Sequence, residues 1–177
     1  MVPNPILAFL VSICHVTLVY FLESHKKLLE KLINADVEFL IIGGFAVNFY
    51  GYNRTTGDLD IWIKPDNSNR EKLIQVLEVM GFNKEDIRTL HQSDFEKVFV
   101  FHIWDKPFRV DFLTHISGID FKKAYRAKEI INLHGLDLPL IDFDHLVLSK
   151  MTTNRLRDKA DVEELQKIAR MKQRKKL

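Results

Sequence analysis

Residues 41–63 read IIGGFAVNFYGYNRTTGDLDIWI, and this is the most informative stretch of the chain. A buried apolar strand runs into a Gly-Gly pair and a short helix, and a second strand over 58–63 then carries two aspartates one residue apart. Residues i and i+2 of a strand project from the same face, so Asp58 and Asp60 are expected to point together while Leu59 points away. Two like charges on an otherwise apolar strand repel each other and resist desolvation. A cation is therefore expected between them, and a divalent metal that carries a nucleoside triphosphate is the economical candidate.

A third acid, Asp111, lies within the apolar segment Phe-Arg-Val-Asp-Phe-Leu of another expected strand. Three carboxylates on adjacent strands can hold two Mg²⁺ ions about 3.5–4 Å apart, and Mn²⁺ would suit the same ligands. Asp58 and Asp60 would bridge both metals, and Asp111 would serve the metal on the nucleophile side. The alternative is three unrelated surface acids, and the pattern Asp-x-Asp followed by a distant Val-Asp-Phe favours the metal site.

The glycines supply the second half of the motif. Gly43 and Gly44 stand where a strand gives way to a helix, so their exposed amides can receive phosphate oxygens at close range. Arg54, just ahead of the acids, is placed to steady a phosphate, although an ordinary surface arginine is an equal alternative. Tyr50 and Tyr52 follow the glycines and are candidates to flank a base.

The remaining pattern predicts a small mixed sheet with helices packed on it, which is an α+β (mixed α/β) fold. The helices are expected over 23–34, 45–50, from the turn at 65–68 through 80, 119–127, 143–153 and 157–171. The strands are expected over 37–42, 58–63, 97–104, 108–114, 129–133 and 136–140, with hairpins at 105–107 and 134–135. We divide the chain into an apolar extension (1–22), a domain (23–170) and a basic tail (171–177).

Bulk properties are those of an ordinary globular protein, with 46% hydrophobic and 28% charged residues and a formal net charge of +2. The single cysteine, Cys14, excludes an internal disulfide framework and fits a reducing, cytoplasmic location. Residues 5–22 carry no charged side chain, which suits a buried accessory helix better than a membrane span or a signal peptide. Five histidines show no metal-ligand spacing and are interpreted as ordinary polar or core residues: His91, His102, His115, His134 and His145.

The segment from Ile42 through the two acids to Ile61 resembles the signature of the DNA polymerase beta-type nucleotidyltransferase superfamily. Within it, the chain looks closest to the AbiEii-like and minimal nucleotidyltransferases of toxin–antitoxin and abortive-infection systems. The resemblance extends over residues 23–170 and includes the segment 141–161, which is similar to a C-terminal pattern of Leu-x-Lys, a basic turn and Lys/Arg-Asp-x-x-Asp. It implies the nucleotidyltransferase fold with a C-terminal helix pair.

By the same resemblance Lys150 would reach the triphosphate, with Arg155 or Arg157 nearby, whereas Asp158 and Asp161 would orient the helix pair. The expected activity is metal-dependent transfer of a nucleoside monophosphate from a triphosphate to a hydroxyl, with release of pyrophosphate. The acceptor would be a side chain of a partner toxin, the 3′ end of tRNA or a small molecule. The rival interpretation is a regulatory module that binds a nucleotide or a partner without turnover.

Overall fold

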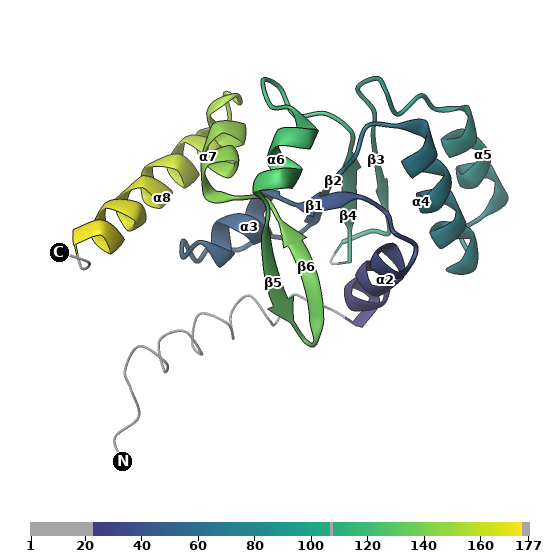
Figure 1. Ribbon diagram of the computed structural model, residues 1–177, viewed down its shortest axis with the longest axis horizontal. Helices are drawn as coiled ribbons and strands as arrows, with labels where there is room; N and C mark the ends of the chain where they lie inside the picture. Colours follow the sequence, from purple (N-terminus) through teal and green to yellow (C-terminus); the bar gives the residue numbers. More distant parts are fainter. Residues whose placement is uncertain (1–22, 107, 175–177) are drawn as a thin grey trace, which may run out of the picture.

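The computed structural model describes residues 23–106 and 108–174, and its core is one mixed sheet with the strand order β3-β4-β2-β1-β6-β5 (Figure 1). The strands are β1 (Phe39–Ile41), β2 (Leu59–Ile63), β3 (Val100–Ile103), β4 (Val110–Leu113), β5 (Glu129–Leu133) and β6 (Leu136–Leu140). The helices are α2 (Glu23–Asn34), α3 (Gly43–Phe49), α4 (Asn67–Val79), α5 (Lys84–Gln92), α6 (Phe121–Ala127), α7 (Phe143–Met151) and α8 (Leu156–Arg174). This architecture confirms the predicted fold class.

The centre of the sheet is made by β4, β2 and β1. Strand β2 runs antiparallel to β1 and parallel to β4, so that Asp60 lies directly opposite Asp111 in the register. Strand β3 continues the sheet as an antiparallel edge strand beside β4. In Figure 1, α2, α4 and α5 lie to the right of the sheet, and α3, α7 and α8 lie to the left.

Alternation along β2 divides its side chains between two faces of the sheet. Leu59, Ile61 and Ile63 are buried in the hydrophobic core. Trp62 points to the opposite face, where its ring meets Phe121 of α6 edge-on at 5.1 Å. Asp60, two residues earlier, shares the face of Trp62. The helix α6 therefore covers this face at Trp62, and the acid lies beyond that contact.

Local chemistry accounts for most of the element boundaries. The side chain of Asp66 accepts a hydrogen bond from the Asn69 amide at 2.7 Å and begins α4. The predicted hairpin at His134 and Gly135 is confirmed, since both residues have positive φ (52° and 82°), as a two-residue type I′ turn requires. The predicted strand over 97–104 is shorter in the structure, because only residues 100–103 pair with β4.

Helix α5 was not expected from the sequence. It is short and mostly polar and buries only Ile87 and Leu90, so too few apolar residues identify it in the sequence. Its beginning is nevertheless capped by Asn83, whose side chain accepts from the amides of Glu85 and Asp86. Capping and packing against α4 stabilise a helix that is otherwise polar.

The two ends of the chain extend past the described part. The charge-free run over 5–22 lies outside the described residues, as do the last three residues of the basic tail, and α8 continues through Arg174. Among the described helices, none combines the length and the apolarity needed to cross a membrane.

Candidate active site

Three acids lie at the beginning of two neighbouring parallel strands. Asp60 of β2 and Asp111 of β4 are register partners, and Asp58 immediately precedes β2. The side chains of Asp58 and Asp111 keep 28% and 22% of their surface exposed, so both remain accessible. The structure thus brings the predicted carboxylates to one end of the sheet.

The glycine turn lies against the central acid. Gly43 has φ +64°, and a Cβ added there would lie 1.9 Å from Oδ2 of Asp60. A Cβ on Gly44 would lie 2.4 Å from Oγ1 of Thr56 and 3.2 Å from Nη1 of Arg54. Glycine is therefore required twice, because only a backbone without side chains fits between the acid and the loop at 54–56.

Burial, followed by the negative charge of Asp111, raises the pKa of Asp60. The nearby Lys150 ammonium and the Gly44 backbone amide lower the pKa, and the charge of Asp58 raises it further. The net shift is upward, so burial and the two neighbouring carboxylates disfavour a charged Asp60 more than Lys150 and the Gly44 amide favour it. A bound cation would favour the charged form.

A buried ion cluster links the glycine turn to the C-terminal helix pair. Arg54 donates two hydrogen bonds to Asp161 of α8, Nε to Oδ1 at 2.6 Å and Nη2 to Oδ2 at 2.8 Å. The Lys150 ammonium of α7 lies 2.7 Å from Oδ1 of Asp158 and 3.2 Å from Oδ2 of Asp161. Asp161 has no exposed side-chain surface, and the side chains of Arg54 and Lys150 each expose 12%.

This cluster gives Asp158 and Asp161 a more specific role than orienting two helices. They hold the two cations, Arg54 and Lys150, beside Gly44 and Asp60. Burial alone would raise the pKa of Asp158, but hydrogen bonds from Lys150 and Thr153 outweigh it and hold the pKa below its usual value. The sequence contained no signal for the pairing of Arg54 with Asp161, because 107 positions separate the two residues.

The other two predicted basic residues are Arg155 and Arg157. Arg157 donates from Nη2 to the carbonyl of Thr55 and thereby contacts the loop that carries Arg54. Arg155 is exposed just ahead of α8, near Asp158. The structure therefore brings Arg54 and Lys150 together and leaves Arg155 at the periphery.

Tyr50 does not flank a base. Its side chain is buried, its hydroxyl donates to the carbonyl of Ile141 at 2.9 Å, and its ring packs edge-on against Phe49 and Phe143. Tyr52, the other candidate, is half-buried.

Two further cations, which the sequence pattern did not indicate, lie beside the acids. Arg109 Nε donates to Oδ1 of Asp111 at 2.8 Å, and Lys106 Nζ lies 3.8 Å from Oδ2 of Asp58. Arg109 and Asp111 are two residues apart, so the period of the strand would have identified this pair. Within residues 23–106 and 108–174, no three His, Cys, Asp or Glu side chains are arranged to hold a metal ion. One oxygen of Asp111 is instead bound by Arg109.

The donor set nevertheless suits a hard cation. In the described part of the chain, Oδ1 of Asp58 is buried and has no hydrogen-bond partner, which leaves an acceptor unsatisfied. A divalent metal would give this oxygen a partner and would also stabilise the charged form of Asp60, whose pKa is raised.

Comparisons with known proteins identify the family of the chain and solved structures to which it is similar. A family model described as "Nucleotidyl transferase of unknown function (DUF2204)" matches residues 21–177. TM1012 from Thermotoga maritima, a protein assigned as a nucleotidyltransferase, superposes with a TM-score of 0.53 at 12% identity, over 81% of this chain and 91% of that one. The lincomycin-bound lincosamide antibiotic adenylyltransferase LnuA gives a TM-score of 0.46 at 15% identity, over 79% of this chain and 92% of LnuA. No curated protein matches the chain.

Proposed function

Because the chain belongs to the family of nucleotidyl transferases of unknown function (DUF2204), we propose that it moves a nucleoside monophosphate from a nucleoside triphosphate to a hydroxyl acceptor with the help of divalent metal. The observation that carries this proposal is the register of β2 and β4, which places Asp60 opposite Asp111 and beside the glycine turn. The same acids scattered over the surface would not support it.

Asp58, Asp60 and Asp111 would hold Mg²⁺ or Mn²⁺ through their carboxylate oxygens. When bound, the metal would lower the pKa of the attacking hydroxyl and neutralise the charge of the triphosphate. Asp111 would exchange its hydrogen bond with Arg109 for this role, and the orphan Oδ1 of Asp58 would gain a partner.

The chain's cations would bind the triphosphate. An ammonium group has three donors, and the contacts of Lys150 with Asp158 and Asp161 leave one donor that would bind the triphosphate near Asp60. Arg54 is anchored by Nε and Nη2 on Asp161, so its Nη1 is presented to the glycine turn, next to Gly44. Fixed donors of this kind stabilise developing charge without reorganisation during the reaction.

In the transfer, the acceptor oxygen forms a bond to the α-phosphorus, and the bond from that phosphorus to the bridging oxygen of the β-phosphate breaks. Pyrophosphate leaves with the electron pair, and the proton of the hydroxyl passes to solvent. Positioning and charge neutralisation supply most of the rate enhancement in phosphoryl transfer generally.

The acceptor and the setting are also proposals. The similarity of segment 141–161 to AbiEii-like proteins supports a toxin–antitoxin or abortive-infection setting in the cytoplasm, with a partner toxin or tRNA as the acceptor. A small-molecule acceptor is the third candidate. A gene for a small helical protein beside this one, and its modification by the purified chain, would support the partner toxin.

The test is label transfer. Purified protein is incubated with Mg²⁺, each of the four triphosphates labelled at the α-phosphate, and either unfractionated protein or total tRNA from a cell lysate. We expect one triphosphate to label one fraction, with EDTA, Asp58→Asn and Asp60→Asn each abolishing the signal. Glu164→Gln, which removes an exposed acid of α8 outside the site, is the matched control. Triphosphate binding without label transfer would instead identify a regulatory module.

A further inference from the structure

His102 extends the row of acids by one strand. In the antiparallel pair of β3 and β4, His102 lies directly opposite Asp111, which itself lies opposite Asp60. Side chains that face each other across paired strands project from the same face of the sheet, with Cβ atoms about 4.5–5.5 Å apart in antiparallel pairs. The order across the sheet is therefore Asp60, Asp111, His102, and His102 at the edge is the most exposed of the three.

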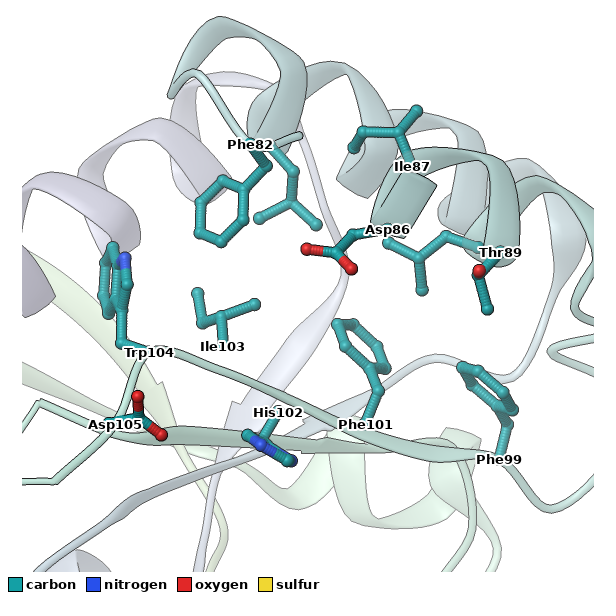
Figure 2. A pocket seen from close by; sticks show the side chains of 12 residues that line it. Phe82, Asp86, Ile87, Thr89, Phe99, Phe101, His102, Ile103, Trp104 and Asp105 are labelled. Atoms are coloured by element: carbon teal, nitrogen blue, oxygen red, sulfur yellow. The ribbon is translucent and has the colours of Figure 1, made fainter. Parts of the chain in front are cut away.

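The opposite face of β3 confirms this orientation. Phe101 points away from the acids, and its ring stacks on that of Phe112 at 4.8 Å. Figure 2 shows Phe99, Phe101 and Ile103 entering a pocket of about 400 Å³ beneath α5, whereas the imidazole of His102 lies on the other side of the strand. His102 is among the residues that line this pocket, but its imidazole lies on the face of the sheet that carries Asp111.

The imidazole of His102 is also unusual among the described histidines in having no side-chain partner within residues 23–106 and 108–174. His25 lies 2.8 Å from a carbonyl, His115 contacts Thr114, and His145 contacts Asp142. His91 lies 3.3 Å from Glu71, and His134 also takes part in an interaction. An exposed imidazole with two ring nitrogens uncommitted, one strand away from Asp111, is available to a ligand.

A small apolar patch, formed by Val100 and Leu113, lies beside His102. Val100, two residues before His102 on the same face, pairs with Leu113, and its side chain is 63% exposed. If an acceptor hydroxyl lies between Asp111 and His102, the part of the acceptor next to that hydroxyl would therefore contact apolar surface.

Building on the proposed function, we propose that His102 is an acceptor-binding residue. Its imidazole forms a hydrogen bond with the acceptor beside Asp111, and Val100 with Leu113 contacts the acceptor's adjacent apolar part. The triphosphate lies on the other side of the row, near Gly43 and Lys150. The row therefore separates the two substrates, with the donor at β2 and the acceptor at β3.

The experiment uses the label-transfer assay with the full chain and compares His102→Ala, His102→Gln and His91→Ala. The amount of the acceptor fraction is varied at saturating triphosphate, and binding of the triphosphate with Mg²⁺ is measured separately by calorimetry. One lost hydrogen bond weakens binding by about three- to tenfold. We expect His102→Ala to raise the half-saturating amount of acceptor by that factor, with triphosphate binding unchanged and much of the loss restored in His102→Gln.

His91→Ala removes a histidine that is also exposed but lies on α5, and it should behave as wild type. Melting temperatures of all three variants should equal that of wild type, since both histidines are exposed. Unchanged half-saturation by acceptor in His102→Ala, or a matching loss of triphosphate binding, would overturn the acceptor role and leave the proposed function standing. A wild-type protein that transfers no label would refute both.

Discussion

Asp161 supplies the sharpest stability prediction, because it holds two cations and is fully buried. Asp161→Asn removes one negative charge from a cluster in which Asp158 and Asp161 balance Arg54 and Lys150. Removing one partner of a buried ion pair costs about 3–5 kcal/mol, mainly because a buried charge is left uncompensated. Asparagine keeps one carbonyl oxygen that can accept from Arg54, so we expect the lower end, about 3 kcal/mol. At about 2–4 °C per kcal/mol for a protein of this size, the melting temperature should fall by about 6–12 °C.

Thermal unfolding followed by circular dichroism at pH 7 measures this effect. Glu164→Gln on the same helix breaks an ion pair with Lys167 that is 2.7 Å long but exposed, and it should change stability by less than about 1 kcal/mol. Asp161→Asn should also weaken triphosphate binding, because Arg54 loses half of its anchor. A variant that melts within the error of wild type would refute the cluster as a source of stability, whatever its activity.

Three further predictions concern the turn, the central acid and pH. Gly43→Ala should abolish label transfer and lower the stability measured by thermal unfolding by about 1–2 kcal/mol or more. The reason is that a positive φ disfavours alanine and that the added Cβ would displace Asp60. Unchanged activity would contradict the close approach of the Gly43 backbone to Asp60. Asp60→Asn should abolish label transfer yet raise the melting temperature of the metal-free protein at pH 7. It removes a carboxylate whose pKa is raised by burial and by Asp111. A lower melting temperature would show that the charge of Asp60 is well compensated in the folded protein. Because the pKa of Asp158 is lowered in the folded protein, its contribution to stability is present above the unfolded value of about 3.9 and is lost as the pH falls through the folded pKa. The gap in melting temperature between wild type and Asp158→Asn should therefore begin to close as the pH falls below about 4 and continue to close as the pH falls through the folded pKa, and a constant gap would contradict this linkage.

Much of the fold follows from local signals. Helix α2 and strands β5 and β6 have the predicted boundaries, because apolar periodicity and the His-Gly turn act within a few residues. Helix α5 was missed because capping by Asn83 and contact with α4 stabilise it more than its own apolar face does. Tyr50, one of two candidates to flank a base, is instead buried, because its environment is set by Ile141 and Phe143, about ninety residues away.

Residue spacing alone predicts the strand that carries Asp58 and Asp60 and the glycine turn before it, since side chains two residues apart on a strand share a face. Which other residues meet there depends on contacts between distant parts of the chain. Strand pairing placed Asp111 opposite Asp60 and His102 opposite Asp111, and packing of α8 placed Asp161 beneath Arg54. These contacts join residues that are far apart in the chain, and they form because the burial of the sheet and of α8 selects one register and one docking position.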